Sequence, residues 1–201
     1  MIELKNVCKN FEQKEIFKDF SYKFNPGEIT VIMGPSGCGK STLLNMIGGL
    51  EKKNSGEILI DNKSIEKYKD NTIFRDKISY LFQNFALIET KTILDNLKIA
   101  LGKNLDLNQV KSLMKELNLN LDIKTPVYML SGGEQQRVSM LRILLKDNPI
   151  ILADEPTGSL DQVNRDIILD LLKQQKAKNK TIIVVTHDPE VTNIADKIIK
   201  L

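Results

Sequence analysis

The chain begins with apolar residues at alternating positions, a pattern typical of strands with one buried face. The alternation covers parts of residues 1–32, and an Asn-Pro-Gly sequence at 25–27 interrupts it. This pattern predicts short strands joined by turns. The sequence Thr-Val-Ile-Met at 30–33 then predicts a buried strand that leads directly into a glycine-rich segment.

Strand and helix patterns alternate after this point. Residues 41–47 predict a helix that stops near Gly48 and Gly49. Between about Phe85 and Met129 strand patterns fade, and apolar residues recur at helical spacing. Further strands are expected at 56–61, 78–82, 150–153 and 181–185, and further helices after 137 and at 164–177. Strands that alternate with helices indicate a largely parallel sheet, with a helical lobe inserted into it.

Composition fits one globular domain of ordinary size. The 201 residues are 41% hydrophobic and 27% charged. No apolar stretch approaches the roughly 18 residues of a membrane span, and the first residues lack an apolar signal core, so we expect a cytoplasmic protein. The net charge of +3 is too small to indicate nucleic acid binding. Cys8 and Cys38 are expected to be reduced thiols.

A glycine-rich loop at 34–41 lies between the predicted strand and helix, which is the context of a phosphate-binding loop. Glycine lets backbone N–H groups approach a polyanion, and the helix N-terminus adds donors and positive dipole. Lys40 can reach the terminal phosphates of a nucleotide, and the Ser41 hydroxyl is suited to Mg²⁺. The expected nucleotide-binding residues are Gly34, Pro35, Ser36, Gly37, Cys38, Gly39, Lys40, Ser41 and Thr42. Cys38 is either simply a small residue in the loop or a redox switch that blocks nucleotide binding.

A second acidic site follows the aliphatic run at 150–153, which ends in Asp154 and Glu155. Parallel sheets place their ligands at the carboxyl ends of strands. Asp154 suits the shell of Mg²⁺, and Glu155 is the right type of side chain to act as general base toward water.

Between these two motifs lies Leu-Ser-Gly-Gly-Glu-Gln-Gln-Arg at 130–137. It has no obvious task at the phosphate loop of its own chain, and it resembles the signature motif of the ATP-binding cassette (ABC) family. The chain resembles ABC ATPases over essentially all of its length. The resemblance implies an α/β P-loop NTPase fold, with a RecA-like, mostly parallel sheet core, an N-terminal antiparallel β subdomain and an inserted helical subdomain. Residues 1–201 would form one domain, in which 1–84 and 136–201 make up the core with the β subdomain and 85–135 the helical subdomain.

The resemblance also implies roles for single residues. Phe11 would stack on adenine, Gln83 would ligate Mg²⁺ at the hinge into the helical lobe, and His187 would contact the γ-phosphate and position Glu155. The signature residues and the Ser-Leu-Asp sequence at 159–161 would face the opposite subunit; those expected to contact its nucleotide are Ser131, Gly132, Gly133, Glu134 and Asp161. Alternatives are open for three residues: Phe11 as a strand core residue, Gln83 as a solvated loop residue, and Asp161 as a helix N-cap.

The implied mechanism is a head-to-tail dimer that ATP closes and hydrolysis reopens, driving a separate membrane subunit on the inner face of the membrane. Residues 82–88 and 92–97 resemble the lipoprotein-release and macrolide-export branch, with its relatives in bacteriocin and antimicrobial-peptide export. Three function classes compete: a transporter subunit that exports or extracts a peptide, lipoprotein or drug-like cargo, a non-transport mechanical coupler, and an ABC ATPase of DNA repair or translation. The third ordinarily has a long coiled coil, zinc cysteines or two cassettes, and the sequence contains none of these.

Overall fold

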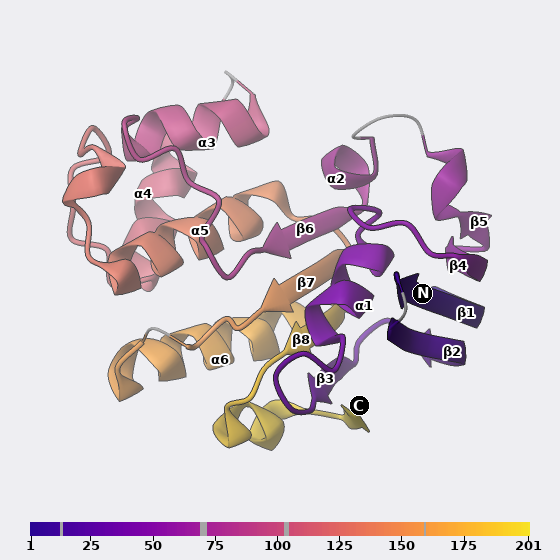
Figure 1. The fold of residues 1–201 in the computed structure, drawn as a ribbon. Helices are drawn as coiled ribbons and strands as arrows, with labels where there is room; N and C mark the ends of the chain where they lie inside the picture. The colour runs from indigo at the N-terminus through magenta and orange to yellow at the C-terminus, as the bar shows by residue number, and fades with distance from the viewer. Residues whose placement is uncertain (13, 69–71, 103–104, 159) are drawn as a thin grey trace.

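The computed structural model describes residues 1–12, 14–68, 72–102, 105–158 and 160–201, which form two sheets and several helices (Figure 1). An antiparallel sheet has the order β2-β1-β4-β5 and consists of β1 (Ile2–Phe11), β2 (Lys14–Phe24), β4 (Ser55–Ile60) and β5 (Lys63–Ser64). A parallel sheet has the order β6-β7-β8-β3-β9 and consists of β6 (Ile78–Leu81), β7 (Ile150–Asp154), β8 (Thr181–Val185), β3 (Ile29–Met33) and β9 (Lys197–Lys200). β9 was not expected.

The prediction of short N-terminal strands was wrong. β1 has 10 residues and β2 has 11. Their pairing shifts register between Leu4 and Val7, between Val7 and Lys9, and between Lys9 and Asn10. Each irregularity moves the following side chains relative to the two faces of the sheet, so one long strand shows only fragments of the alternating pattern.

The helices are α1 (Lys40–Ile47), α2 (Thr72–Asp76), α3 (Ile93–Leu101), α4 (Leu107–Glu116), α5 (Gly132–Lys146) and α6 (Gln162–Ala177). Short 3₁₀ turns are η1 (Ile65–Lys67), η2 (Val127–Met129) and η3 (Pro189–Ile194). α2 and the 3₁₀ turns were not expected, because each is too short to show a helical period in the sequence. Within the described residues, no helix combines the length and apolar character that a membrane span requires.

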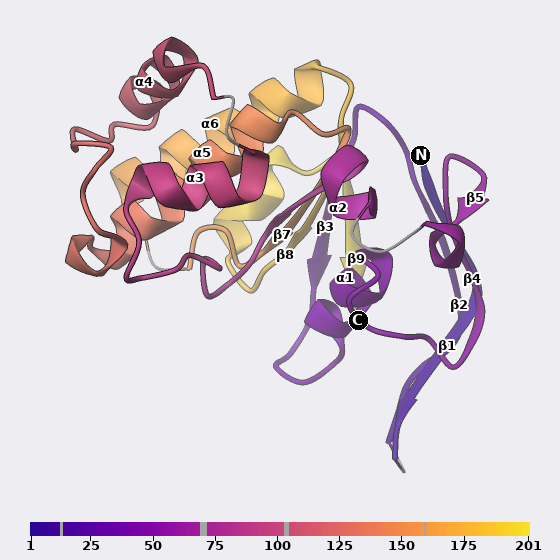
Figure 2. The same cartoon turned by 90° about the horizontal axis from the view of Figure 1, so that it is seen from above.

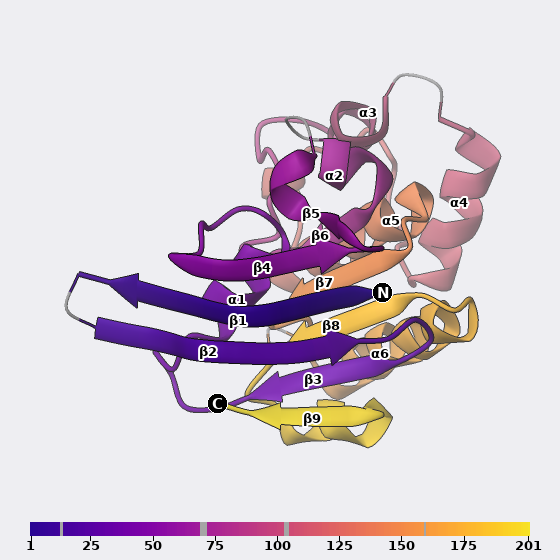
Figure 3. The same ribbon diagram turned by 90° about the vertical axis from the view of Figure 1, so that its right-hand side faces the viewer.

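The parallel sheet is buried on both faces and divides the core in two. Val31 and Ile151 belong to one apolar cluster, which α5 and α6 cover. Their neighbours Ile32 and Leu152 point to the opposite face and join a second cluster, with α1 and the antiparallel sheet. Figures 2 and 3 show this order of layers: α3–α6 lie on one side of the parallel sheet, and α1 and the antiparallel sheet lie on the other.

The middle of the chain forms the helical part that the sequence indicated. α3 and α4 both contact α5 (Figure 1). α5 also contacts β6 and α6, so it connects the two outer helices to the sheet. The expected boundary at 135/136 falls inside α5, which is continuous from Gly132 to Lys146. The division into a core and a helical subdomain stays a prediction.

Candidate active site

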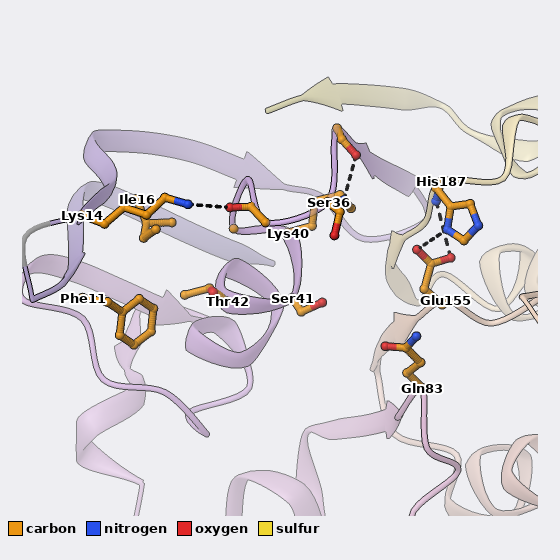
Figure 4. A pocket seen from close by; sticks show the side chains of 13 residues that line it. Phe11, Lys14, Ile16, Ser36, Lys40, Ser41, Thr42, Gln83, Glu155 and His187 are labelled. Carbon is orange, nitrogen blue, oxygen red and sulfur yellow. Dashed lines mark hydrogen bonds and ion pairs between the residues drawn. The ribbon is translucent and has the colours of Figure 1, made fainter.

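A cleft of about 680 Å³ lies where the parallel strands end and the antiparallel sheet begins. Gln83, Glu155 and His187 follow closely after β6, β7 and β8, so the strand order brings them to one edge of the sheet. Figure 4 shows Phe11 at one end of the cleft, these three residues at the other, and the start of α1 between them. The lining residues are Phe11, Lys14, Ile16, Gly34, Ser36, Gly37, Gly39, Lys40, Ser41, Thr42, Gln83, Glu155 and His187.

The loop before α1 wraps around the ammonium group of Lys40. Its Nζ donates hydrogen bonds to the carbonyl oxygens of Gly34 (2.8 Å) and Pro35 (2.9 Å), and the backbone N–H of Cys38 donates to Pro35 (3.3 Å). Pro35 and Cys38 therefore shape the loop, although neither lines the cleft. Gly39 has a φ of 103°, and a Cβ at this position would lie 2.4 Å from Cγ2 of Ile16. Only glycine fits there, so the loop can pass close to β2.

The Ser41 hydroxyl donates a hydrogen bond of 3.1 Å to Oδ1 of Asp154, the last residue of β7. Asp154 is only 8% exposed. Burial raises the pKa of its carboxyl above the ordinary value and the neighbouring Glu155 adds to the rise, whereas the Ser41 hydroxyl and Lys40 oppose it. Three possible oxygen ligands lie on the elements around the cleft: the hydroxyl of Ser41, the carboxylate of Asp154 and the amide of Gln83. Mg²⁺ prefers oxygen ligands. The residues present therefore fit this ion.

Three side chains form a connected polar group at the other end of the cleft. Oε1 of Glu155 lies 2.8 Å from Nδ1 of His187, and Oε2 accepts a hydrogen bond of 2.9 Å from the Thr186 hydroxyl. Thr186 is fully buried. Glu155 has a left-handed φ of 49°, uncommon for a residue with a side chain, and its backbone N–H donates to Val185 (2.8 Å). Backbone strain of this kind is characteristic of functional sites.

The signature residues lie elsewhere, in a second cleft of about 370 Å³. Its lining residues are Ser131, Gly132, Gly133, Glu134, Arg137, Leu160, Asp161 and Asn164, and it shares none of them with the first cleft. Ser131 caps α5: its hydroxyl accepts a hydrogen bond from the backbone N–H of Glu134, whose carboxylate in turn accepts one from the N–H of Ser131. Bonding to the backbone and hydroxyl of Ser131 lowers the pKa of Glu134.

Asp161 is the N-cap of α6. Its carboxylate accepts a hydrogen bond of 2.9 Å from the backbone N–H of Asn164. The N-cap alternative raised by the sequence is therefore realised, and it does not conflict with a role toward a second copy, which stays a prediction. Ser159, the first residue of the same sequence motif, lies outside the described residues.

A family model described as "ABC transporter" matches residues 17–158, well over half of the chain. The chain belongs to the ABC transporter family. An uncharacterized ABC transporter ATP-binding protein of Methanocaldococcus jannaschii, MJ1508, is 41% identical over 100% of this chain and 95% of its own length. The macrolide export ATP-binding/permease protein MacB of Campylobacter jejuni is 36% identical over 100% of this chain, which spans only 33% of that relative.

Solved structures agree with this assignment. The structure described as a dimeric structure of MJ0796, a bacterial ABC transporter cassette, has a TM-score of 0.90 and 38% identity, and it covers 100% of this chain and 94% of that one. A post-hydrolysis dimer of the same cassette, described as bound to ADP and Pi, has a TM-score of 0.88 and 37% identity over the same shares. The predicted ABC ATPase fold is confirmed, and the chain is an ATPase of the ABC family.

Three residues of this ABC ATPase were not predicted as part of the site. Thr186 holds the carboxylate of Glu155, and a hydroxyl next to the predicted His187 was the available signal. Lys14 and Ile16 line the cleft from β2, and Nζ of Lys14 donates to the carbonyl oxygen of Gly37 (3.3 Å). No motif marks these two residues, because it is the tertiary contact of β2 with the phosphate loop that brings them there.

Proposed function

We propose that this ABC ATPase energises a separate membrane subunit, through an ATP-closed, head-to-tail dimer that opens again after hydrolysis. The separation of the two clefts carries this proposal: one chain presents the phosphate loop and the signature residues in two clefts with no lining residue in common. Each chain then holds half of two different ATP sites, and a second copy can complete both. The dimeric structures of the similar cassette MJ0796 support this assembly.

In the proposed complex, the ring of Phe11 stacks on adenine at one end of the cleft and the phosphates lie along the start of α1. Lys40 gives its hydrogen bonds to phosphate oxygens in place of the loop carbonyl oxygens that it contacts here. Ser41, Gln83 and Asp154 would hold Mg²⁺, directly or through water. When bound, magnesium neutralises negative charge on the phosphate oxygens.

Glu155 is the proposed general base for hydrolysis. Its carboxylate takes a proton from the attacking water, whose oxygen forms a bond to the γ-phosphorus while the bond from that phosphorus to the bridging oxygen of ADP breaks. Thr186 holds one carboxylate oxygen from the protein side. His187 faces the other oxygen and, at 75% exposure of its side chain, remains accessible to the γ-phosphate.

The second copy contributes the signature cleft. The first backbone N–H groups of α5, at Gly132 and Gly133, are donors at a helix N-terminus and favour an anion such as the γ-phosphate. Glu134 keeps Ser131 in its capping position beside them. Asp161 borders the same cleft and would contact the opposite chain.

Residues 85–135 form the proposed helical subdomain, and a groove beside it suits the membrane subunit. A cleft of about 170 Å³ is lined by residues of α2, β6, α3 and α5. Aromatic side chains line it, including Phe74 and Tyr80, together with the cations Arg142 and Lys146. This lining favours a partner helix that carries apolar and acidic side chains. The ATPase would then sit on the cytoplasmic face of the membrane.

The cargo class follows from similarity. MacB, whose name specifies macrolide export, supports an exporter of a drug-like cargo. The resemblance of residues 82–88 and 92–97 to the lipoprotein-release and peptide-export relatives extends the proposal to a peptide or lipoprotein. This chain spans only 33% of the length of MacB, so the cargo stays a proposal.

The test is the Glu155→Gln variant, with Glu116→Gln on the exposed side of α4 as its matched control. We expect hydrolysis to fall by about 10²–10⁴-fold, the range for loss of a general base. Light scattering should show a dimer for Glu155→Gln under saturating ATP and magnesium, whereas the control should hydrolyse ATP normally. A hydrolysis-dead protein that remains monomeric under these conditions, even with the membrane subunit supplied, would contradict the proposed function.

A further inference from the structure

Lys9 lies two residues before Phe11 on β1, and its side chain reaches the ring of Phe11. Nζ of Lys9 is 4.2 Å from the centroid of the Phe11 ring. An ammonium group at this distance is attracted to the electron-rich face of an aromatic ring. Lys9 is 7% exposed and absent from the cleft lining, whereas Phe11 is 43% exposed and lines the cleft. One face of the ring is therefore covered by the cation, and the ring remains accessible from the cleft.

The ammonium of Lys9 is fixed from behind by two further contacts. It donates hydrogen bonds to Oε1 of Glu51 (2.6 Å) and to the carbonyl oxygen of Lys52 (2.8 Å). These partners balance a buried charge that would otherwise be costly. Because the group is held on three sides, its position over the ring is set by the fold.

The same contacts connect the two parts of the cleft. Glu51 follows the C-terminal end of α1, and its backbone N–H donates to the carbonyl oxygen of Asn45 in that helix (3.2 Å). α1 begins in the phosphate loop at Lys40. Lys9 therefore joins the strand that carries Phe11 to the helix that carries the phosphate-binding residues.

We propose that Lys9 is a positioning residue for the adenine base: it backs the Phe11 ring and holds it at a fixed place relative to the phosphate loop. This inference rests on the proposed stacking of adenine on Phe11. Lys9 itself does not touch the nucleotide. Its contribution to ATP affinity passes through the ring, so it should be absent for a ligand without a base and absent when the ring is removed.

The experiment compares the dissociation constants of ATP and inorganic tripolyphosphate, measured by titration calorimetry. The proteins are the wild type, Lys9→Met, Phe11→Leu and the double variant. We expect Lys9→Met to weaken ATP binding by about three- to tenfold, the effect of losing one partly buried cation–π contact. Tripolyphosphate affinity should stay unchanged, and Lys9→Met should have no further effect in the Phe11→Leu background.

Two variants serve as matched controls. Lys9→Arg keeps a cation over the ring and should restore most of the ATP affinity. Lys5→Met removes an exposed lysine from the same strand and should change neither dissociation constant. Glu51→Gln weakens the anchor of Lys9 at a more exposed position, and it should weaken ATP but not tripolyphosphate. It provides the same readout if Lys9→Met does not fold.

The outcomes separate this inference from the proposed function. Equal weakening of ATP and tripolyphosphate, or an unchanged effect of Lys9→Met without the Phe11 ring, would overturn the positioning role and leave adenine stacking intact. Full ATP affinity of Lys9→Met, together with weak ATP binding by Phe11→Leu, would also overturn the positioning role of Lys9 and leave adenine stacking intact. Full ATP affinity in Phe11→Leu would instead refute the stacking itself, and the role of Lys9 with it.

Discussion

Nδ1 of His187 faces Oε1 of Glu155 at 2.8 Å, although the two side chains differ sharply in exposure, at 75% and 12%. The pairing of two strands explains why these side chains lie together. β7 and β8 are adjacent and parallel, and Asp154 pairs with Val185, so the residues just after each strand emerge side by side. The half-buried carboxylate of Glu155 is thus held from the protein side by Thr186, while the imidazole of His187 covers it from the side of the cleft.

Replacing His187 by alanine should slow hydrolysis by about 100-fold, the lower end of the range for a group that assists proton transfer. ATP affinity should change little, because the phosphate loop is intact. Single-turnover hydrolysis and equilibrium ATP binding measure the two effects separately. A variant with normal hydrolysis would exclude His187 from the catalytic group.

Thr186→Val removes the hydroxyl that holds Oε2 of Glu155 and keeps the shape of the side chain. The turnover number should fall by about tenfold, and the stability by about 1–3 kcal/mol, because a buried hydrogen-bonding partner is lost. Thr186→Ser retains the hydroxyl and serves as the control. If valine and serine gave the same turnover, the hydroxyl would have no part in orienting Glu155.

Lys40→Met should weaken ATP binding by about 100-fold, the loss expected for a pair of charge-assisted hydrogen bonds to phosphate. Lys14→Met is the matched control: this lysine also contacts the loop, but it is exposed and reaches only the Gly37 carbonyl oxygen. Lys14→Met should weaken ATP binding by a few-fold at most. Retained nucleotide affinity in Lys40→Met would contradict the phosphate-loop assignment.

A mixture of two inactive chains tests the shared site. Ser131→Arg blocks the signature cleft and Lys40→Ala disables the phosphate loop, so each homodimer should lack both active sites. A mixed dimer regains one, formed by the phosphate loop of the Ser131→Arg chain and the signature of the Lys40→Ala chain. We expect the mixture to recover part of the wild-type rate of phosphate release. No recovery, with mixed dimers shown by pull-down of a tagged chain, would count against composite sites.

Asp154→Asn should stabilise the protein in the absence of magnesium and nucleotide. Because burial raises the pKa of Asp154, the fold penalises its ionised form, and the penalty is fully present above the folded-state pKa. Asparagine removes it, for a gain of about 1–3 kcal/mol. The gain should vanish as the pH falls below about 4, where the unfolded aspartate also binds its proton.

Thermal unfolding in chelator across this pH range is the measurement. With ATP and magnesium present, the wild type should be more stable than Asp154→Asn, since the variant lacks a metal-binding carboxylate. A stability difference that does not depend on pH would show that charge burial is not its cause.

The sequence predicted the parallel sheet well, because its strands are short aliphatic runs that end at recognisable motifs. The strand expected at 150–153 continues by one residue to Asp154, and the helix expected at 164–177 begins at Gln162. Gln83, Glu155 and His187 could be singled out for the same reason, because each lies in a motif that closely follows one of these strands. The remaining contributors to the cleft, Lys14 and Ile16, belong to a strand with no motif and with shifted register, and their place depends on tertiary pairing.

The left-handed backbone of Glu155 has a consequence for how an isolated chain behaves. Its unusual conformation and the three hydrogen-bond contacts of its carboxylate are all made within one chain. In the proposed dimer, each copy would bring a preformed general base, and only the signature cleft of the second copy would remain to be added. A single copy would then bind ATP without hydrolysing it, and turnover would depend on pairing with a second copy.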